Sequence, residues 1–84
     1  MMNHYKKTHV PVSEILLIRE KIAEATKGMK IGPAVIVSDT KKIWNDELNR
    51  WEAIEACINV YGYFHEDEGS VMKKLGFLEL VSSF

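Results

Sequence analysis

The hydrophobic positions of this chain divide it into segments with helical spacing and short apolar runs. Helical spacing predicts a helix at about residues 13–28 and a longer one at about 40–62. A third helix is predicted at about 66–75, where acids come first and lysines last, as the helix dipole favours. The apolar runs "AVIVS" (34–38) and "FLELV" (77–81) indicate strands.

These segments predict an α+β fold, in which three helices and a short two-stranded sheet form one small domain. Two short strands are not stable alone, so we expect them to pair with each other and to lie against the helices. Residues 1–12 are mostly polar and contain Pro11, which indicates an N-terminal arm with extended backbone. Residues 13–84 are then the single globular domain, which is the number that a chain of this length predicts.

The predicted helices carry more apolar surface than so short a chain is expected to cover. Trp44 and Trp51 stand seven residues apart, on one face of the predicted long helix, and tryptophan is enriched where proteins bind one another. Leu16 and Leu17 lie on either side of the apolar stripe of the first helix. We therefore predict a partner or dimer interface at Leu16, Leu17, Trp44 and Trp51, with a second copy of the chain as the expected occupant.

The net charge of −1 hides an uneven distribution. Residues 1–42 hold eight Lys/Arg and four Asp/Glu, whereas residues 43–84 hold three and eight. The favoured interpretation is that the two halves attract each other, within one chain or between two copies. The other interpretation is an anionic partner for the basic residues. The candidate anion contacts are Lys6, Lys7, Lys41, Lys42, Lys73 and Lys74.

The segment "YGYFHEDEGS" (61–70) is the densest group of candidate chemical side chains. Its acids are not spaced as in a calcium loop, and His65 has no zinc-ligand spacing to another histidine or to Cys57. Acids in the first turn of a helix have a structural reason to be there. We interpret the segment as a helix junction and predict no metal site, no cofactor and no catalytic residue.

These observations predict a small intracellular regulatory or adaptor protein that acts by protein–protein interaction, self-associates as a homodimer and is not an enzyme. The alternative is a winged-helix-like nucleic-acid-binding module, because that fold uses a similar order of helices and strands. The acidic start of the short helix and the acidic second half count against a nucleic-acid partner.

The location is predicted to be cytoplasmic. Cys57 is a single cysteine and has no partner for an intramolecular disulfide, which indicates a reducing compartment. The first residues lack the apolar core of a signal peptide, and the longest aliphatic runs are far too short to cross a membrane. We therefore expect no membrane association.

Overall fold

The computed structural model describes residues 2–80 of the 84-residue chain. The first residue of the predicted N-terminal arm and the last residue of the predicted strand 77–81 lie outside the described residues. The described elements, in chain order, are β1 (Asn3–Pro11), the 3-10 turn η1 (Val12–Glu14), α1 (Ile15–Thr26), β2 (Ala34–Asn45), β3 (Arg50–Gly62), α2 (Glu66–Lys74) and β4 (Leu78–Leu80).

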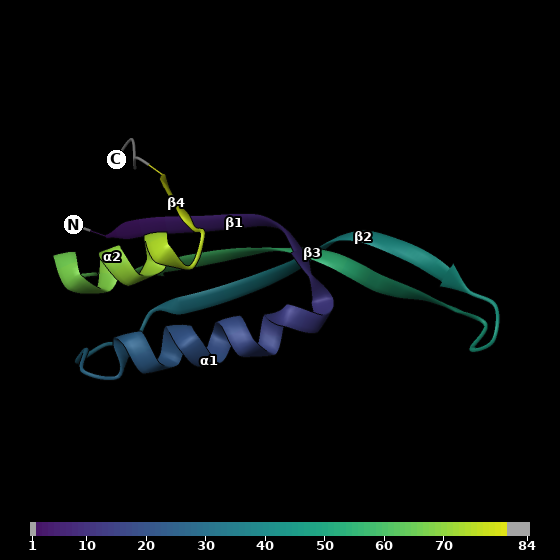
Figure 1. The fold of residues 1–84 in the computed structure, drawn as a ribbon, viewed down its shortest axis with the longest axis horizontal. Helices are drawn as coiled ribbons and strands as arrows, with labels where there is room; N and C mark the ends of the chain where they lie inside the picture. Colours follow the sequence, from purple (N-terminus) through teal and green to yellow (C-terminus); the bar gives the residue numbers. More distant parts are fainter. Residues whose placement is uncertain (1, 81–84) are drawn as a thin grey trace.

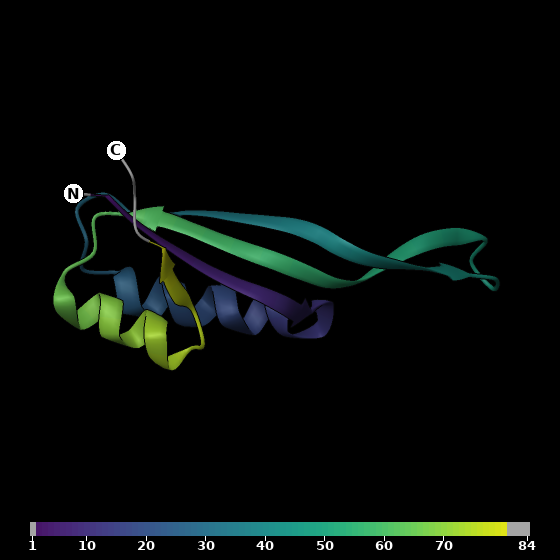
Figure 2. The same ribbon diagram turned by 90° about the horizontal axis from the view of Figure 1, so that it is seen from above.

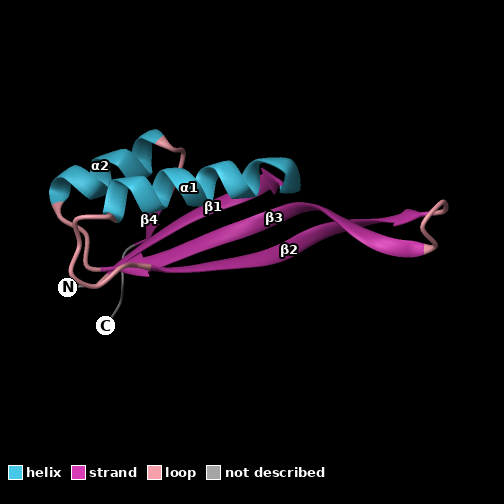
Figure 3. Cartoon of the chain, turned by 90° about the horizontal axis from the view of Figure 1, so that it is seen from below, coloured by secondary structure: helices cyan, strands magenta, loops and turns pink. Residues whose placement is uncertain are grey.

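The strands form one antiparallel sheet in the order β2-β3-β1-β4. Each α-helix joins two strands that are not neighbours, so β3 lies between β1 and β2, and β1 lies between β3 and β4. This element order and strand order define the ferredoxin-like split β-α-β topology. Both helices cover the same face of the sheet, which leaves the other face open (Figures 1 and 3).

The hydrophobic core lies between the helices and the covered face of the sheet. In β3, every second residue from Ala56 to Val60 points toward the helices and is fully buried, as the two-residue period of a strand requires. The helices contribute apolar side chains from the opposite side. The largest cluster of buried residues comprises Tyr5, Val10, Ile18, Ile22, Ile58, Val60, Met72 and Phe77.

The prediction of a long helix at 40–62 is wrong, because this segment is most of an antiparallel hairpin made by β2 and β3. The chain reverses at residues 46–49, where Asn45 and Asn49 are residue types that favour turns. Ile58 and Val60 alternate with less buried neighbours and pack against both helices, so burial follows the period of a strand. The apolar positions that fit a helical stripe were divided between two strands.

The prediction of three helices with a two-stranded sheet is wrong for the same reason, since residues 2–80 form two α-helices and a four-stranded sheet. The segments 34–38 and 78–80, from two runs that were expected to pair, belong to β2 and β4 at opposite edges of the sheet. Residues 3–11, which the sequence placed in an N-terminal arm, form β1 between β3 and β4. The element order behind the winged-helix alternative is therefore absent from the described chain. Helices do form close to 13–28 and 66–75.

A close contact between β1 and α2 fixes how the second helix sits on the sheet. The ring of Tyr5 is buried and meets Phe64 edge-on at a centroid distance of 5.0 Å. Its hydroxyl points at the backbone of Gly69, where a Cβ atom would come within 2.5 Å of it. A side chain at position 69 would therefore have to displace either the buried ring or the helix.

We predict that Gly69→Ala lowers the free energy of unfolding by about 1–3 kcal/mol, because the clash outweighs the roughly 1 kcal/mol by which alanine favours a helix. Chemical denaturation measures the change. Gly28→Ala is the matched control, since nothing lies within 4 Å of its new methyl group, and it should change stability by less than about 0.5 kcal/mol. Equal effects of the two substitutions would contradict this description of the helix contact.

Candidate functional site

The β2–β3 hairpin continues well past the part of the sheet that the helices cover. Its outer part, residues 41–54, forms a twisted two-stranded ribbon at one end of the molecule, which we call the hairpin extension (Figures 1 and 2). It gives the molecule an elongated shape of 46 × 28 × 20 Å. A two-stranded ribbon has little stability of its own in water, so local contacts must hold it.

The turn at the tip of the extension is built from asparagines. The side-chain oxygen of Asn45 accepts a hydrogen bond of 3.1 Å from the backbone N–H of Leu48. Asn49 has φ of 54°, in the left-handed region that asparagine tolerates better than most residues. Asp46 and Glu47 also lie in the turn, so the tip carries two acidic side chains.

Trp44 and Trp51 stand directly opposite each other on the extension and hold its strands together. Their rings meet edge-on, with centroids 5.6 Å apart and an interplanar angle of 73°. Such aromatic pairs contribute about 0.5–1.5 kcal/mol beyond the area that they bury. Even so, 45% of Trp44 and 64% of Trp51 remain exposed, and Ile43 and Leu48 are about half exposed as well. The extension therefore presents four large apolar side chains to solvent.

Irregularities in strand pairing mark the base of the extension. The register of β2 with β3 shifts between Asp39 and Lys41 and again between Lys41 and Lys42, as at β-bulges, which increase local twist. Glu55 joins two elements here, because its carboxylate lies 3.2 Å from His9 Nδ1 and 3.9 Å from Lys41 Nζ. These contacts tie the base of the extension to the end of β1.

The open face of the sheet carries a chain of polar contacts across β1 and β3. His4 stacks on Tyr61 at 4.3 Å between ring centroids, and its Nε2 lies 2.7 Å from Asn59 Oδ1. Asn59 Nδ2 in turn donates to Cys57 Sγ at 3.6 Å. Asn59 therefore separates the imidazole from the buried thiol, and among the described residues no basic side chain forms a hydrogen bond with the sulfur. This arrangement does not activate Cys57 as a nucleophile.

A polar hollow of about 350 Å³ lies between α2 and the sheet. Tyr5 lies in its wall, and burial raises the pKa of the Tyr5 hydroxyl above its ordinary value of 10.0, with the negative charge of Glu79 as a second cause. Glu79 also contacts Lys73 at 3.5 Å and accepts a hydrogen bond from Asn3 at 3.0 Å. Lys73 and Glu79, two charged groups of the wall, therefore pair with each other.

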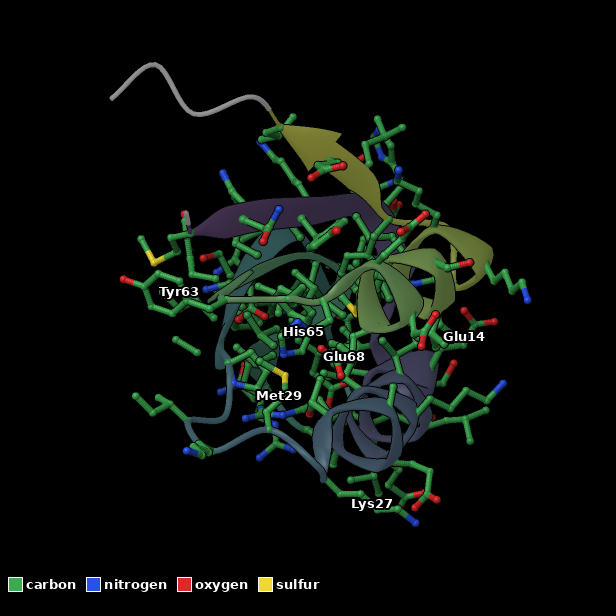
Figure 4. The ribbon with its side chains drawn as sticks, turned by 90° about the vertical axis from the view of Figure 1, so that its left-hand side faces the viewer. Glu14, Lys27, Met29, Tyr63, His65 and Glu68 are labelled. Carbon is green, nitrogen blue, oxygen red and sulfur yellow. The ribbon has the colours of Figure 1, made fainter. Side chains whose placement is uncertain are left out.

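A hollow of about 460 Å³ lies at the end of the molecule farthest from the hairpin extension (Figure 4). The loop between α1 and β2 forms one wall with Met29, Lys30 and Ile31, and the segment before α2 forms the other with Tyr63 and His65. Ile31 is 73% exposed and Tyr63 60% exposed. We call this largely apolar concavity the end hollow.

The four residues predicted as an interface lie in two separate parts of the molecule, the hairpin extension and α1. Trp44 and Trp51 contact each other on the extension, whereas Leu16 and Leu17 project from α1, largely exposed. Leu17 borders a shallow hollow between α1 and α2. Sequence reasoning missed Ile43 and Leu48 as further exposed apolar side chains of the extension. The turn formers Asn45 and Asn49, which lie between the two tryptophans, were the available sequence signal for a hairpin.

The six lysines suggested as anion contacts are spread over the molecule. Lys6 is on β1, and Lys7 donates to the backbone oxygen of Leu75 at 2.9 Å. Lys41 contacts Glu55 and Lys73 contacts Glu79, so both face carboxylates. Two more, Lys42 and Lys74, lie on the extension and on α2. Lys7 and Lys74 border the same hollow, together with Lys21, but the six lysines do not form one patch.

The segment 61–70 joins β3 to α2, so the junction lies between a strand and a helix. The backbone N–H of His65 donates to the Glu68 carboxylate at 2.8 Å, which is half of a capping box. Three acids occupy the first turn of α2, and Lys73 and Lys74 occupy its last turn. Among residues 2–80, no group of three or more His, Cys, Asp or Glu side chains is arranged to hold a metal ion.

Comparison with known proteins identifies no relative of this chain: no family model matches it, and neither does a curated protein or a solved structure. In the part of the chain that is described, no helix is long and apolar enough to span a membrane. What the chain does must therefore be inferred from its own surfaces.

The raised pKa of Tyr5 predicts a loss of stability in alkali. Above about pH 10 the unfolded tyrosine ionises while the folded one resists, so the free energy of unfolding should fall as pH rises. Denaturation of the wild type and Tyr5→Phe at about pH 8 and about pH 11 isolates this effect from Tyr61 and Tyr63. A loss just as large in Tyr5→Phe would contradict it.

The hairpin extension should open independently of the core, because no helix covers it. We predict that native-state hydrogen exchange is faster for amides of residues 41–54 than for those of Ile58 and Val60. Trp51→Ala should accelerate exchange further in the extension and leave the thermal midpoint of the core nearly unchanged. Ile58→Ala is the control and should destabilise the whole molecule by about 2–5 kcal/mol. Uniform protection along β3 would contradict the prediction.

Proposed function

We propose that this chain is a small adaptor or regulatory protein that binds another protein chain through its hairpin extension. The observation that carries the proposal is the exposure of Ile43, Trp44, Leu48 and Trp51 on a ribbon that projects beyond the helix-covered body. Large apolar patches left open to water mark interaction surfaces. Covering these side chains would also give the ribbon the packing that it lacks.

The chemistry of the extension favours a protein partner. Its two tryptophans present broad rigid surfaces with few rotatable bonds, and tryptophan is the side chain most enriched among residues that dominate binding energy. The tip carries Asp46 and Glu47, which disfavour an approach to phosphate. The lysines on the rest of the molecule are scattered and partly paired with carboxylates. Nucleic acid is accordingly not the partner that we propose.

The proposed activity is binding rather than catalysis, with no cofactor. One observation supports this proposal. On the open face, Asn59 stands between His4 and Cys57, so the imidazole does not contact the thiol that it would have to activate. We also propose a cytoplasmic location. In its favour, Cys57 is a buried free thiol, the state that a reducing compartment maintains.

We predict that Trp44→Ala/Trp51→Ala weakens binding to the cognate partner by about 30-fold or more, the loss expected when two central aromatic contacts are removed. The partner is captured on the immobilised chain, identified by mass spectrometry and purified, and its dissociation constant is then measured by titration calorimetry. Leu78→Ala is the matched control, because Leu78 is 72% exposed but lies on β4, away from the extension. Unchanged affinity of the double variant would refute the proposal.

A further inference from the structure

The outer edge of the sheet supplies a second observation about the same surface. β2 is an edge strand over its whole length from Ala34 to Asn45, hydrogen-bonded to β3 on one side and to no strand of residues 2–80 on the other. A long exposed edge offers unpaired backbone N–H and C=O groups to another strand. The side chains along this edge include Ile36, Ile43 and Trp44, which are about half exposed.

The bulge in β2 decides which side chains share a face along this edge. Before the bulge, Ile36 pairs with Asn59 on the open face, and Val35 packs into the core on the covered face. After it, Lys41 pairs with Glu55 on the open face, so Ile43 is also on the open face and Trp44 on the other. In a regular strand, positions 36 and 43 would point to opposite faces. The extra residue places them on the same one.

From this pattern we propose that two copies of the chain pair through β2, antiparallel and over its full length, to form one continuous eight-stranded sheet. Ala34 of one copy then lies opposite Asn45 of the other. Ile36 faces Ile43 on the open face, and Val35 faces Trp44 on the covered face. The bulges of the two copies meet at the centre, where Asp39 lies next to Thr40. The three apolar side chains of the edge that are about half exposed, Ile36, Ile43 and Trp44, each gain an apolar neighbour from the other strand.

The same alignment places the tip of each hairpin extension against the end hollow of the other copy. Residues 46 and 47 fall opposite positions 33 and 32 of the second copy, at the end of the loop between α1 and β2. The acids at the tip, Asp46 and Glu47, then approach the basic Lys30 at the rim of the hollow. The exposed Leu48 meets the apolar wall formed by Met29, Ile31 and Tyr63 (Figure 4).

Both the charges and the apolar surfaces are therefore complementary between copies. Because the pairing is two-fold, each copy gives one extension and receives one, and the assembly closes as a dimer. This inference rests on the proposed function, since it names a second copy as the chain that the extension binds. The pairing through β2 leaves the open face of the eight-stranded sheet exposed to solvent.

Disulfide trapping tests the alignment. In a Cys57→Ser background, Ile36→Cys/Ile43→Cys should form a covalent dimer on mild oxidation, because directly opposed residues have Cα atoms about 4.5–5.5 Å apart, within disulfide range. The same two positions of one chain are roughly 23 Å apart, so they cannot join within a copy. The single variants, and Ser38→Cys/Ile43→Cys with its mismatched register, are the controls and should remain monomeric on a non-reducing gel.

Sedimentation velocity of the unmodified protein provides the second measurement and should give twice the 9.6 kDa mass of the chain. Cross-linking of Ile36→Cys alone, or of the mismatched pair, would overturn the alignment. A monomer at every concentration, without cross-linking, would overturn the dimer. If tryptophan-dependent binding to a different protein persisted in that case, the proposed function would stand and only the second copy would be wrong as its partner.

Discussion

The pairing of β2 with β3 is the interaction on which the rest of this structure depends. Its inner part closes the sheet over the core, where Ile58 and Val60 are fully buried against the helices. Its outer part continues as the hairpin extension, with no helix beneath it. One continuous hairpin therefore has two environments, and the change between them coincides with the bulges near Lys41. The position of the bulges sets where the body of the domain ends.

The outer part of the hairpin is held by few contacts. The edge-on tryptophan pair, the carboxylate of Glu55 between His9 and Lys41, and the asparagine turn are its main local supports. The aromatic pair contributes about 0.5–1.5 kcal/mol, and an exposed ion pair contributes about 1 kcal/mol or less. Because the ribbon has few supporting contacts and several exposed apolar side chains, a partner that covers these side chains would stabilise it. The inferred pairing through β2 would cover its edge and one of its faces at once.

Only part of this fold could be predicted from the amino-acid sequence. The approximate positions of α1 and α2 followed from apolar spacing and, for α2, from its acids and lysines, because these signals are local. The segment from Ile43 to Tyr61 satisfied a helical period by coincidence, since residues of two strands fell on one stripe. Its real signals were the alternation of Ala56, Ile58 and Val60 and the turn formers Asn45 and Asn49. The bulges interrupt the alternation in β2, so only its first part, residues 34–38, was predicted as a strand.

The candidate site was also only partly accessible from sequence. Trp44 and Trp51 were selected on two grounds. Tryptophan is common at interfaces, which does not depend on secondary structure, but their seven-residue spacing was interpreted as one face of a helix, which residues 40–62 do not form. Their direct opposition across two strands depends on the hairpin register, which the helical interpretation excluded. Leu16 and Leu17 joined the same prediction through an apolar excess on α1, a separate element. Tertiary arrangement, rather than residue type, decided which of these side chains share a surface.

The most direct test of the account is a nuclear magnetic resonance dilution series on the isotope-labelled chain. If β2 pairs with β2 of a second copy, raising the concentration should shift the amide signals of residues 34–45 and of the loop at 28–33. It should also slow hydrogen exchange at the outward-facing amides of β2. Shifts confined to β1 and β4 on the open face, or spectra that do not change with concentration, would contradict it.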